Sequence, residues 1–333
     1  MKKTRFAQYG TKHFHAEGKY RALQSNSNIE VAGVYEPDAS RRSELEQSDG
    51  PFAGAAFYHR KEELLGDSSI VAVASEGMYD EHIDQTEEII RSGKHVWHDK
   101  PAGTDLEQWR RILDMASDND LHVQVGYMLR FHNGVRLIDE LIESGVLGDL
   151  FAIRVNMSTN IPERLCDMLK GFPGGTFFDL APHMLDLIIR FLGRPEKITS
   201  FLRNDGNLVE GFKDNTVAVL EYQKAMATVS IAAMEANASQ GRRFEVQGSN
   251  GNATMQPLET TDVLILNIKE PRQGYGEGAH ELSFDKQSRQ ALYDLELASF
   301  LEIIQKKKAP DCSIEHEFLV QETLLRSVNE EMS

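Results

Sequence analysis

The feature that most constrains the fold is the regular alternation, over residues 4–125, of short β-rich runs with longer amphipathic stretches. This alternation is typical of βαβ units, which build a parallel sheet because parallel strands must be joined by crossovers. Apolar residues at helical spacing predict crossover helices over Tyr79–Ser92 and Asp105–Ser117, and Gly93 is placed to end the first. We predict six strands, at Thr4–Tyr9, Ile29–Tyr35, Ala55–Phe57, Ile70–Ala74, His95–Trp97 and Leu121–Val125.

After Gly126 the pattern changes, and β-rich runs begin to dominate. The runs Val217–Tyr222 and Ala227–Ala232 are separated by the short stretch Gln223–Met226, which predicts a β-hairpin. Adjacency of the runs along the chain predicts a mainly antiparallel sheet. The predicted strands are Phe151–Ser158, Lys197–Leu202, Thr216–Tyr222, Ala225–Ala233, Arg243–Gln247, Ala253–Gln256 and Val263–Leu266.

The domain organisation follows from length and from this change of pattern. A single hydrophobic core has usually stopped growing at 333 residues, so we expect two domains, residues 1–126 and 127–333. The first is an α/β domain with a doubly wound parallel sheet, and the second is an α+β domain. Helical patterns in the second lie at Gly134–Glu143, Leu292–Lys306 and Glu315–Asn329, and the terminal helices can pack back on the first domain.

Charge and cysteine content exclude several classes of partner. The formal net charge of -16 opposes binding to nucleic acid or to an anionic membrane surface. No run of about 18 apolar residues is present, and Met1–Gly10 does not read as a signal peptide, so we expect a cytoplasmic protein. Cys166 and Cys312 have no C-x-x-C spacing, so we expect both to be reduced thiols.

The first strand runs directly into Gly10, where a helix N-terminus would hold the pyrophosphate of a dinucleotide on its backbone N–H groups. The turn reads Gly10-Thr11-Lys12-His13-Phe14-His15, and it keeps one glycine of the G-x-G-x-x-G spacing. Lys12 and His15 occupy the second and third glycine places. Lys12 can offset phosphate charge or block the close backbone approach, and the sequence leaves both open. Gly10, Thr11, Lys12, His13 and Phe14 are the predicted cofactor contacts here.

The second strand ends at Val34-Tyr35-Glu36-Pro37-Asp38, and Glu36 is placed to bind a ribose diol. Because a carboxylate repels a 2′-phosphate, Glu36 favours NAD over NADP. Arg41 and Arg42 lie close enough in the sequence to weaken that preference. The alternative interpretation is that Glu36 is a solvated loop charge.

The segment His98-Asp99-Lys100-Pro101-Ala102 follows the fifth strand, at the edge where parallel sheets bind their ligands. A lysine beside a bound nicotinamide can hydrogen-bond a substrate hydroxyl and stabilise a developing alkoxide. Lys100 is therefore a candidate catalytic residue.

The segment Gly174–His183 opens an amphipathic helix that reaches Leu192. Asp179 and His183 are four residues apart, so they share one helix face, and a carboxylate beside an imidazole can relay protons. His183 is then the candidate general base. The alternative is a solvent-facing stripe continued by Asp186 and Arg190.

Histidine pairs elsewhere do not predict a metal site. His13 with His15, and His95 with His98, lack a third ligand at a recognisable spacing, so we expect no metal. Trp97 and Trp109 are expected to pack in the core.

These segments in this order resemble the glucose-fructose oxidoreductase, inositol dehydrogenase and MocA family, Gfo/Idh/MocA, over almost the whole chain. Asp99-Lys100-Pro101 is similar to its E-K-P signature, and Pro173–His183 to its G-G-G-x-x-x-D-x-x-x-H signature. His82, Gly126–Phe131 and Phe244–Gly248 are further similarities. The departures are Asp99 for glutamate, the two lost glycines, and Glu76-Gly77 for the more usual Pro-Asn.

The resemblance implies an N-terminal Rossmann domain that binds NAD or NADP, and a C-terminal domain with an open-faced, mainly antiparallel sheet. It implies that Lys100 holds the reacting oxygen, His183 takes or returns the hydroxyl proton, and Asp179 orients the substrate or the histidine. Ser75 and His82 are expected near the cofactor. The expected substrate-lining residues are Tyr127, Arg130, Asn156 and Arg164.

The resemblance further implies a homodimer or homotetramer that associates through the open sheet face. Asn160–Phe172 is expected to form a lid or substrate loop. The leading hypothesis is a dehydrogenase acting on a secondary alcohol of a sugar, inositol or related polyol. The alternatives are a tight-cofactor enzyme that uses transient oxidation, such as an epimerase, sugar–sugar oxidoreductase or glycosidase, and a non-catalytic sugar or nucleotide sensor.

Overall fold

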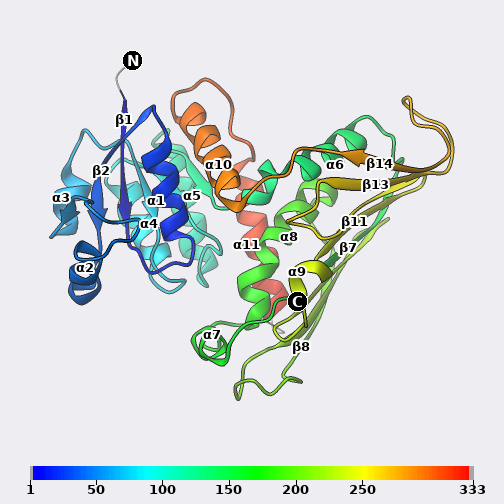
Figure 1. Cartoon of the computed structure of the whole chain (residues 1–333), viewed down its shortest axis with the longest axis horizontal. Coiled ribbons are helices and arrows are strands. Elements are labelled where there is room, and N and C mark those ends of the chain that lie inside the picture. The colour runs from blue at the N-terminus through cyan, green and yellow to red at the C-terminus, as the bar shows by residue number, and fades with distance from the viewer. Residues whose placement is uncertain (1–2, 330–333) are drawn as a thin grey trace. The chain divides into compact units, whose positions relative to one another are not determined.

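The computed structural model describes residues 3–329 and divides the chain into two compact units. Unit 1 takes the chain up to Met128 together with Arg289–Phe318, and unit 2 takes Leu129–Ser288 together with the chain from Leu319. Unit 1 is therefore discontinuous in sequence. Figure 1 labels many of the elements of both units.

Unit 1 is built on a six-stranded sheet in the order β3-β2-β1-β4-β5-β6, in which every pair is parallel. Its strands β1, β4, β5 and β6 are largely buried, as expected for a sheet covered on both faces. The structure confirms the predicted doubly wound sheet. The strands are β1 (Thr4–Tyr9), β2 (Ile29–Tyr35), β3 (Phe57–Tyr58), β4 (Ala72–Ser75), β5 (His95–His98) and β6 (Val123–Val125).

Side-chain caps begin two helices of unit 1, because a carboxylate satisfies the free N–H groups of a first turn. Asp38 accepts from Ser40 and Arg41 at the start of α2, and Asp105 accepts from Gln108 at the start of α5. Helix α4 begins later than its apolar pattern predicted, since the chain before it turns and Glu81 accepts from the Met78 N–H. The helices are α1 (Ala16–Ser25), α2 (Ala39–Glu46), α3 (Lys61–Gly66), α4 (His82–Arg91), α5 (Leu106–Asp118) and α10 (Arg289–Ile304).

The strand order places a topological switch point between β1 and β4, because the chain leaves β1 toward β2 on one side and later returns to β4 on the other. Open α/β sheets bind ligands in the crevice outside the carboxyl ends of the strands at such a point. The loops after β1 and β4 flank this crevice.

Unit 2 is built on an eight-stranded sheet in the order β14-β13-β12-β11-β7-β10-β9-β8. The pair β7–β10 is parallel and the other neighbouring pairs are antiparallel, which confirms the predicted mainly antiparallel sheet. The β9–β10 hairpin is confirmed as well. The strands are β7 (Leu150–Asn156), β8 (Lys197–Arg203), β9 (Asn215–Glu221), β10 (Met226–Ala232), β11 (Arg243–Gly248), β12 (Gly251–Met255), β13 (Val263–Ile268) and β14 (Gly278–Ser283).

Helix α8 (Thr176–Leu192) packs against β7 and β10 on one face of this sheet (Figure 1). The other face carries partly exposed side chains at alternate positions, so the residues of each strand divide between a core and an open face. The remaining helices of this part of the chain are α6 (Asn133–Glu143), α7 (Glu163–Leu169) and α9 (Ala238–Gly241), and α11 (Ile314–Val328) begins in unit 1 and continues in unit 2. Across residues 3–329, none of the helices has both the length and the apolar character needed to span a bilayer.

Candidate functional site

Gly10 brings the two loops at the switch point into contact. Its φ is +85°, and a Cβ built on it would lie 2.6 Å from the backbone nitrogen of Gly77, so a side chain does not fit. The His13 N–H donates to the Glu76 carbonyl oxygen at 3.1 Å. The loop after β1 is therefore held directly against the loop after β4.

Helix α1 begins at Ala16, and its N-cap residue His15 makes no side-chain cap hydrogen bond. An N-terminus without a side-chain cap suits a bound anion. Thr11 and His13 are buried, whereas Phe14 is 48% exposed and Lys12 is partly exposed. The predicted cofactor residues of this loop therefore divide into buried and exposed side chains.

Glu36 at the end of β2 is fully buried. Its Oε2 accepts from the Thr11 hydroxyl at 2.5 Å, and its Oε1 accepts from the Asp38 N–H at 2.9 Å. The Arg41 guanidinium donates to the Thr11 carbonyl and hydroxyl oxygens. The alternative of a solvated loop charge is therefore wrong, because Glu36 ties the end of β2 to the loop after β1.

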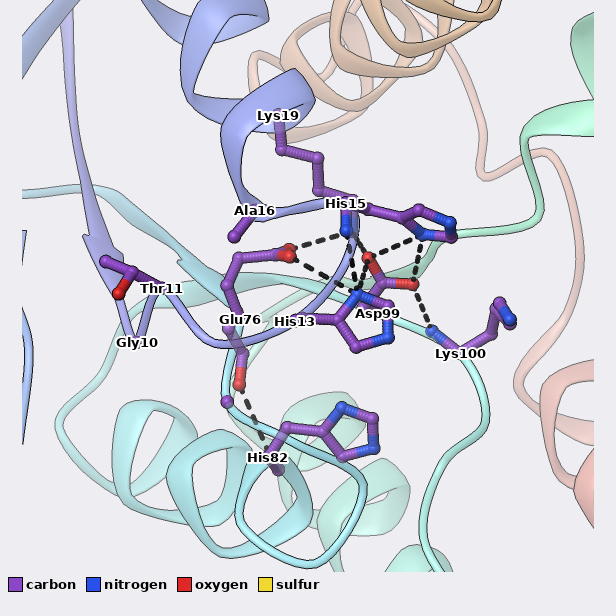
Figure 2. Close-up of polar contacts among 12 residues, drawn as sticks. Gly10, Thr11, His13, His15, Ala16, Lys19, Glu76, His82, Asp99 and Lys100 are labelled. Atoms are coloured by element: carbon purple, nitrogen blue, oxygen red, sulfur yellow. Dashed lines mark hydrogen bonds and ion pairs between the residues drawn. The ribbon is translucent and has the colours of Figure 1, made fainter. Parts of the chain in front are cut away.

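A buried ionic network connects the loop after β1 with α1 and with the loops after β4 and β5 (Figure 2). The Lys19 ammonium, on α1, lies 3.0 Å from Glu76 Oε1 and 3.2 Å from Asp99 Oδ2, and all three side chains are fully buried. The same ammonium stands 4.6 Å from the centre of the Trp97 ring. Lys19 thereby joins α1 to the loops after β4 and β5.

Two imidazoles complete this network, which we define as His13, His15, Lys19, Glu76 and Asp99. His13 Nδ1 lies 3.1 Å from Asp99 Oδ2, and His15 Nδ1 lies 3.2 Å from both Asp99 oxygens. The backbone N–H that follows Asp99 donates to its Oδ1 at 2.7 Å. A short acidic side chain can fold back in this way onto the next residue of the chain.

The charges of the network are mutually compensated. Burial alone would raise the pKa of Asp99, but His13, Lys19 and His15 outweigh burial and hold it well below its usual range. Burial raises the pKa of Glu76 well above its usual value, against the opposing charge of Lys19. Burial lowers the pKa of His15 to about 4 in spite of Asp99, so this imidazole is neutral at neutral pH.

The fold brings a third potential metal ligand, Asp99, to the pair His13 and His15, which the sequence spacing did not show. Ligand atoms of His13, His15 and Asp99 all lie within 4.8 Å of one another. However, the Lys19 ammonium lies 3.2 Å from the Asp99 oxygen that a metal ion would need. Burial would lower the pKa of Lys19, but Asp99, Glu76 and Glu296 raise it overall. The network therefore contains its own cation.

Lys100 is the second residue after β5 and is 2% exposed. Ser75, at the end of β4, donates its hydroxyl to the His82 carbonyl oxygen at 3.2 Å. The His82 ring lies 4.6 Å from the ring of His98 and 6.1 Å from that of His13, centre to centre. Burial, and then these neighbouring imidazoles, lower the pKa of His82 well below its usual value. These residues share the carboxyl edge of the unit 1 sheet.

Asp179 and His183 lie four residues apart on α8 in unit 2. Gly175 precedes this helix with a φ of +55°, and a Cβ on it would lie 2.6 Å from the Lys213 carbonyl oxygen. His183 and Asp186 are buried, at 3% and 1% exposure, so the alternative of a solvent-facing stripe does not hold for them. The meeting of Lys100 with Asp179 and His183 at one carbon stays a prediction.

The four expected substrate-lining residues have different environments. Arg130 is buried and donates from Nε to both carboxylate oxygens of Asp186, at 2.9 and 3.0 Å. Asn156 donates to Glu235 and to the Gly241 carbonyl oxygen. Their contacts with substrate stay predictions, as do those of two others, buried Tyr127 and exposed Arg164.

Arg164 lies on α7, a helix within the segment 160–172 that we expected to be a lid or substrate loop. Cys166 and Leu169 anchor this helix, since both are buried. Trp97 and Trp109 are fully buried, which confirms their predicted packing.

Sequence reasoning missed Lys19. The signal was available, because Lys19 lies four residues after His15 and therefore on the same face of α1. A lysine on an amphipathic helix is nevertheless ordinarily a solvent-facing residue. Its burial depends on carboxylates that follow two other strands.

Comparison with known proteins gives the family. A family model described as "Oxidoreductase family, NAD-binding Rossmann fold" matches residues 5–127, and one described as "GFO/IDH/MocA C-terminal domain" matches residues 135–254. The chain is 23% identical to myo-inositol 2-dehydrogenase of Thermotoga maritima over 291 residues, 86% of this chain and 84% of that protein. It is 25% identical to scyllo-inositol 2-dehydrogenase (NADP+) of Bacillus subtilis over 230 residues, 67% of this chain and 62% of that protein.

A solved structure agrees in fold. The NAD binding oxidoreductase from Klebsiella pneumoniae superposes with a TM-score of 0.83 at 16% identity, covering 99% of this chain and 96% of that one.

The residues of unit 1 fit a nicotinamide dinucleotide. Gly10 closes the turn after β1, the N-terminus of α1 has no side-chain cap, and Glu36 stands at the end of β2. These are the parts that hold the pyrophosphate and the ribose in this class of sheet. NAD or NADP is accordingly the cofactor, and the chain belongs to the Gfo/Idh/MocA family of NAD-binding oxidoreductases.

Proposed function

We propose that this chain transfers a hydride between a nicotinamide dinucleotide and a secondary alcohol of a sugar, inositol or related polyol. The observation that carries the proposal is the placement of Lys100. It follows β5 at the carboxyl edge of the dinucleotide-binding sheet, and its backbone N–H is bound by Asp99. The two inositol dehydrogenases among the relatives support the class of substrate.

The chain's own residues divide the work. Lys100 donates a hydrogen bond from its ammonium to the reacting oxygen, and Asp99 fixes the backbone that carries it. His183 takes or returns the hydroxyl proton on an imidazole nitrogen, and Asp179, one helical turn earlier, orients the imidazole or the substrate. The bound dinucleotide supplies the nicotinamide that accepts or donates the hydride.

A binding titration with NAD, NADH, NADP and NADPH, followed by a panel of polyols and sugars, tests the proposal. We expect saturable binding of at least one redox pair and reduction or oxidation with a member of the panel. Dinucleotide that co-purifies and is never released would favour the transient-oxidation alternative. Binding without any turnover would favour a sensor.

Lys100→Ala should lower the turnover number by about 10²- to 10⁴-fold, the usual contribution of such a group. The dissociation constant for the dinucleotide should stay within about twofold, because Lys100 acts on the reacting oxygen rather than on the pyrophosphate. Lys61→Ala is the control, since Lys61 lies on the surface helix α3 and pairs with Glu88. Turnover at the wild-type rate in Lys100→Ala would refute the assignment.

We also propose that the chain self-associates through the open face of the unit 2 sheet. Phe201, Met226 and Ile265 lie on that face and are 60%, 49% and 37% exposed. Phe201→Glu should lower the mass measured by light scattering. Phe151→Glu is the matched control, because Phe151 is 48% exposed but has the strand parity of buried Ile153. An unchanged mass in Phe201→Glu would contradict this surface.

A further inference from the structure

An ion pair joins the two loops at the switch point of unit 1. The Lys12 ammonium lies 2.8 Å from Glu81 Oε1. Lys12 belongs to the loop after β1, and Glu81 is the N-cap residue of α4, at the end of the loop after β4. These two loops flank the crevice in which doubly wound sheets hold their ligands.

Lys12 lies nearer to solvent than the buried network does. The side chains of Lys12 and Glu81 are 31% and 35% exposed, whereas the carboxylates below them, Glu76 and Asp99, are fully buried and bound to Lys19. The Lys12–Glu81 pair is therefore accessible from solvent, whereas the buried network is not.

The surroundings of Lys12 are strongly acidic. The hydrogen bond to Glu81 raises the pKa of Lys12, and the charges of Glu81, Glu36 and Asp38 add to it against a smaller effect of burial. A dinucleotide pyrophosphate carries negative charge into the same region, so it would be repelled by these three carboxylates. The Lys12 ammonium is placed to offset that repulsion.

We propose that Lys12 binds the dinucleotide pyrophosphate. Before the dinucleotide binds, Glu81 holds the Lys12 ammonium in an ion pair. The inference rests on the proposed function. Lys12 occupies the second glycine place of the loop, where a glycine would let the backbone itself approach the phosphates. A lysine replaces that close approach with a mobile charge at the end of a flexible stem.

The exchange of partners is favourable on general grounds. An ion pair between half-exposed side chains contributes little, because water screens both charges. A pyrophosphate bound at the helix N-terminus offers the ammonium two charged phosphoryl groups in place of one carboxylate. Glu81 keeps a second interaction when Lys12 leaves, since its Oε2 accepts from the Met78 N–H.

The test measures dissociation constants for NADH and NADPH, and for ADP-ribose as a probe that keeps the pyrophosphate and lacks the nicotinamide. Lys12→Ala should weaken binding of the preferred dinucleotide and of ADP-ribose by about tenfold each, the size expected for one lost charge-assisted bond. Adenosine, which has no phosphate, should bind wild type and Lys12→Ala equally.

Glu81→Gln removes the competing charge and keeps an acceptor oxygen for the Met78 N–H. It should tighten binding of the preferred dinucleotide by about two- to fivefold, as expected for release from an exposed ion pair. The double variant Lys12→Ala/Glu81→Gln should bind no more tightly than Lys12→Ala, because Glu81 acts through Lys12. Glu88→Gln is the matched control, since it removes one negative charge from α4 at the similarly exposed Lys61–Glu88 pair. Binding by this control should be unchanged.

Unchanged or tighter binding by Lys12→Ala would overturn the inference. Tighter binding would show that the Lys12 side chain hinders the dinucleotide. Equal tightening in Glu81→Gln and Glu88→Gln would overturn it too, because net charge would then explain both. If wild type binds neither NADH nor NADPH, the proposed function fails as well. If wild type binds and Lys12→Ala is unaffected, this inference fails alone.

Discussion

At the scale of single residues, Lys19 is a lysine whose ammonium is buried in unit 1. Its ammonium is fully buried between Glu76 and Asp99 and lies over the Trp97 ring. Removing one partner of a buried ion pair is costly, because the remaining charges have neither water nor a counter-ion. The network therefore makes the position of the loop after β5, and of Lys100 with it, dependent on a side chain from α1.

Lys19→Met should lower the free energy of unfolding by about 3–5 kcal/mol, since it leaves Asp99 and Glu76 without their cation. Chemical denaturation followed by circular dichroism measures the change. Lys61→Met is the control, and its loss should stay below about 1 kcal/mol because the Lys61–Glu88 pair is half-exposed. Equal losses in the two variants would show that the buried pair has no special weight. Adding Glu76→Gln to Lys19→Met should recover part of the loss.

At the scale of elements, helix α8 carries both Asp179 and His183, so its placement decides where those side chains lie. Two ion pairs fix it. Asp186 accepts from Arg130 in the interior, and Arg190 donates to Asp139 of α6 in a more exposed position. The interior pair has 2% and 1% side-chain exposure, so water screens it far less than the second pair.

Asp186→Asn should therefore destabilise the fold by about 3–5 kcal/mol, because it removes a negative charge that faces the buried Arg130 guanidinium. Asp139→Asn tests the second pair on the same helix and should cost about 1 kcal/mol or less. Thermal denaturation of the two variants beside wild type gives the comparison. A larger loss in Asp139→Asn than in Asp186→Asn would contradict the assigned role of Arg130.

At the scale of the whole molecule, four histidines of unit 1, of which His95 is only partly buried, contribute to the response to acid. Burial lowers the pKa of His15 and His95 to about 4 and of His98 to about 3, and lowers that of His82 well below 6.5. The unfolded chain binds these protons near pH 6.5, while the folded chain stays neutral to much lower pH. Stability should therefore fall as pH falls from about 6.5 toward 4.

Glu76 opposes this trend, because its raised pKa favours the folded state at lower pH above the unfolded value of 4.5. Burial also raises the pKa of Asp139 and lowers that of His132, so two carboxyl groups oppose five imidazoles and the net change should be a loss. Urea denaturation midpoints at pH 7.5, 6.0 and 5.0 measure it, and the midpoint should decrease at each step. A midpoint that rises between pH 7.5 and 5.0 would show that the folded chain binds more protons than the unfolded chain, which contradicts the lowered pKa of these imidazoles.

The sequence by itself determined the alternation of elements in unit 1, the antiparallel sheet of unit 2, and the turns that carry Gly10 and Lys100. These features depend on local spacing, since apolar period and turn chemistry act over a few residues. The sequence did not predict edge strand β14, because most of its side chains are polar or small. It did not predict α7 either, because this helix is short and begins after Pro162.

Only the tertiary structure decided which charged side chains pair with one another in the interior. Lys19, Glu76 and Asp99 come from three separate elements, and Arg130 meets Asp186 across 56 residues of chain. Sequence spacing carries no information about such pairs, because they depend on strand order, on register and on which helix covers which face. Burial then converts these ordinary surface residue types into compensated charges, since a charge removed from water must find its partner within the protein.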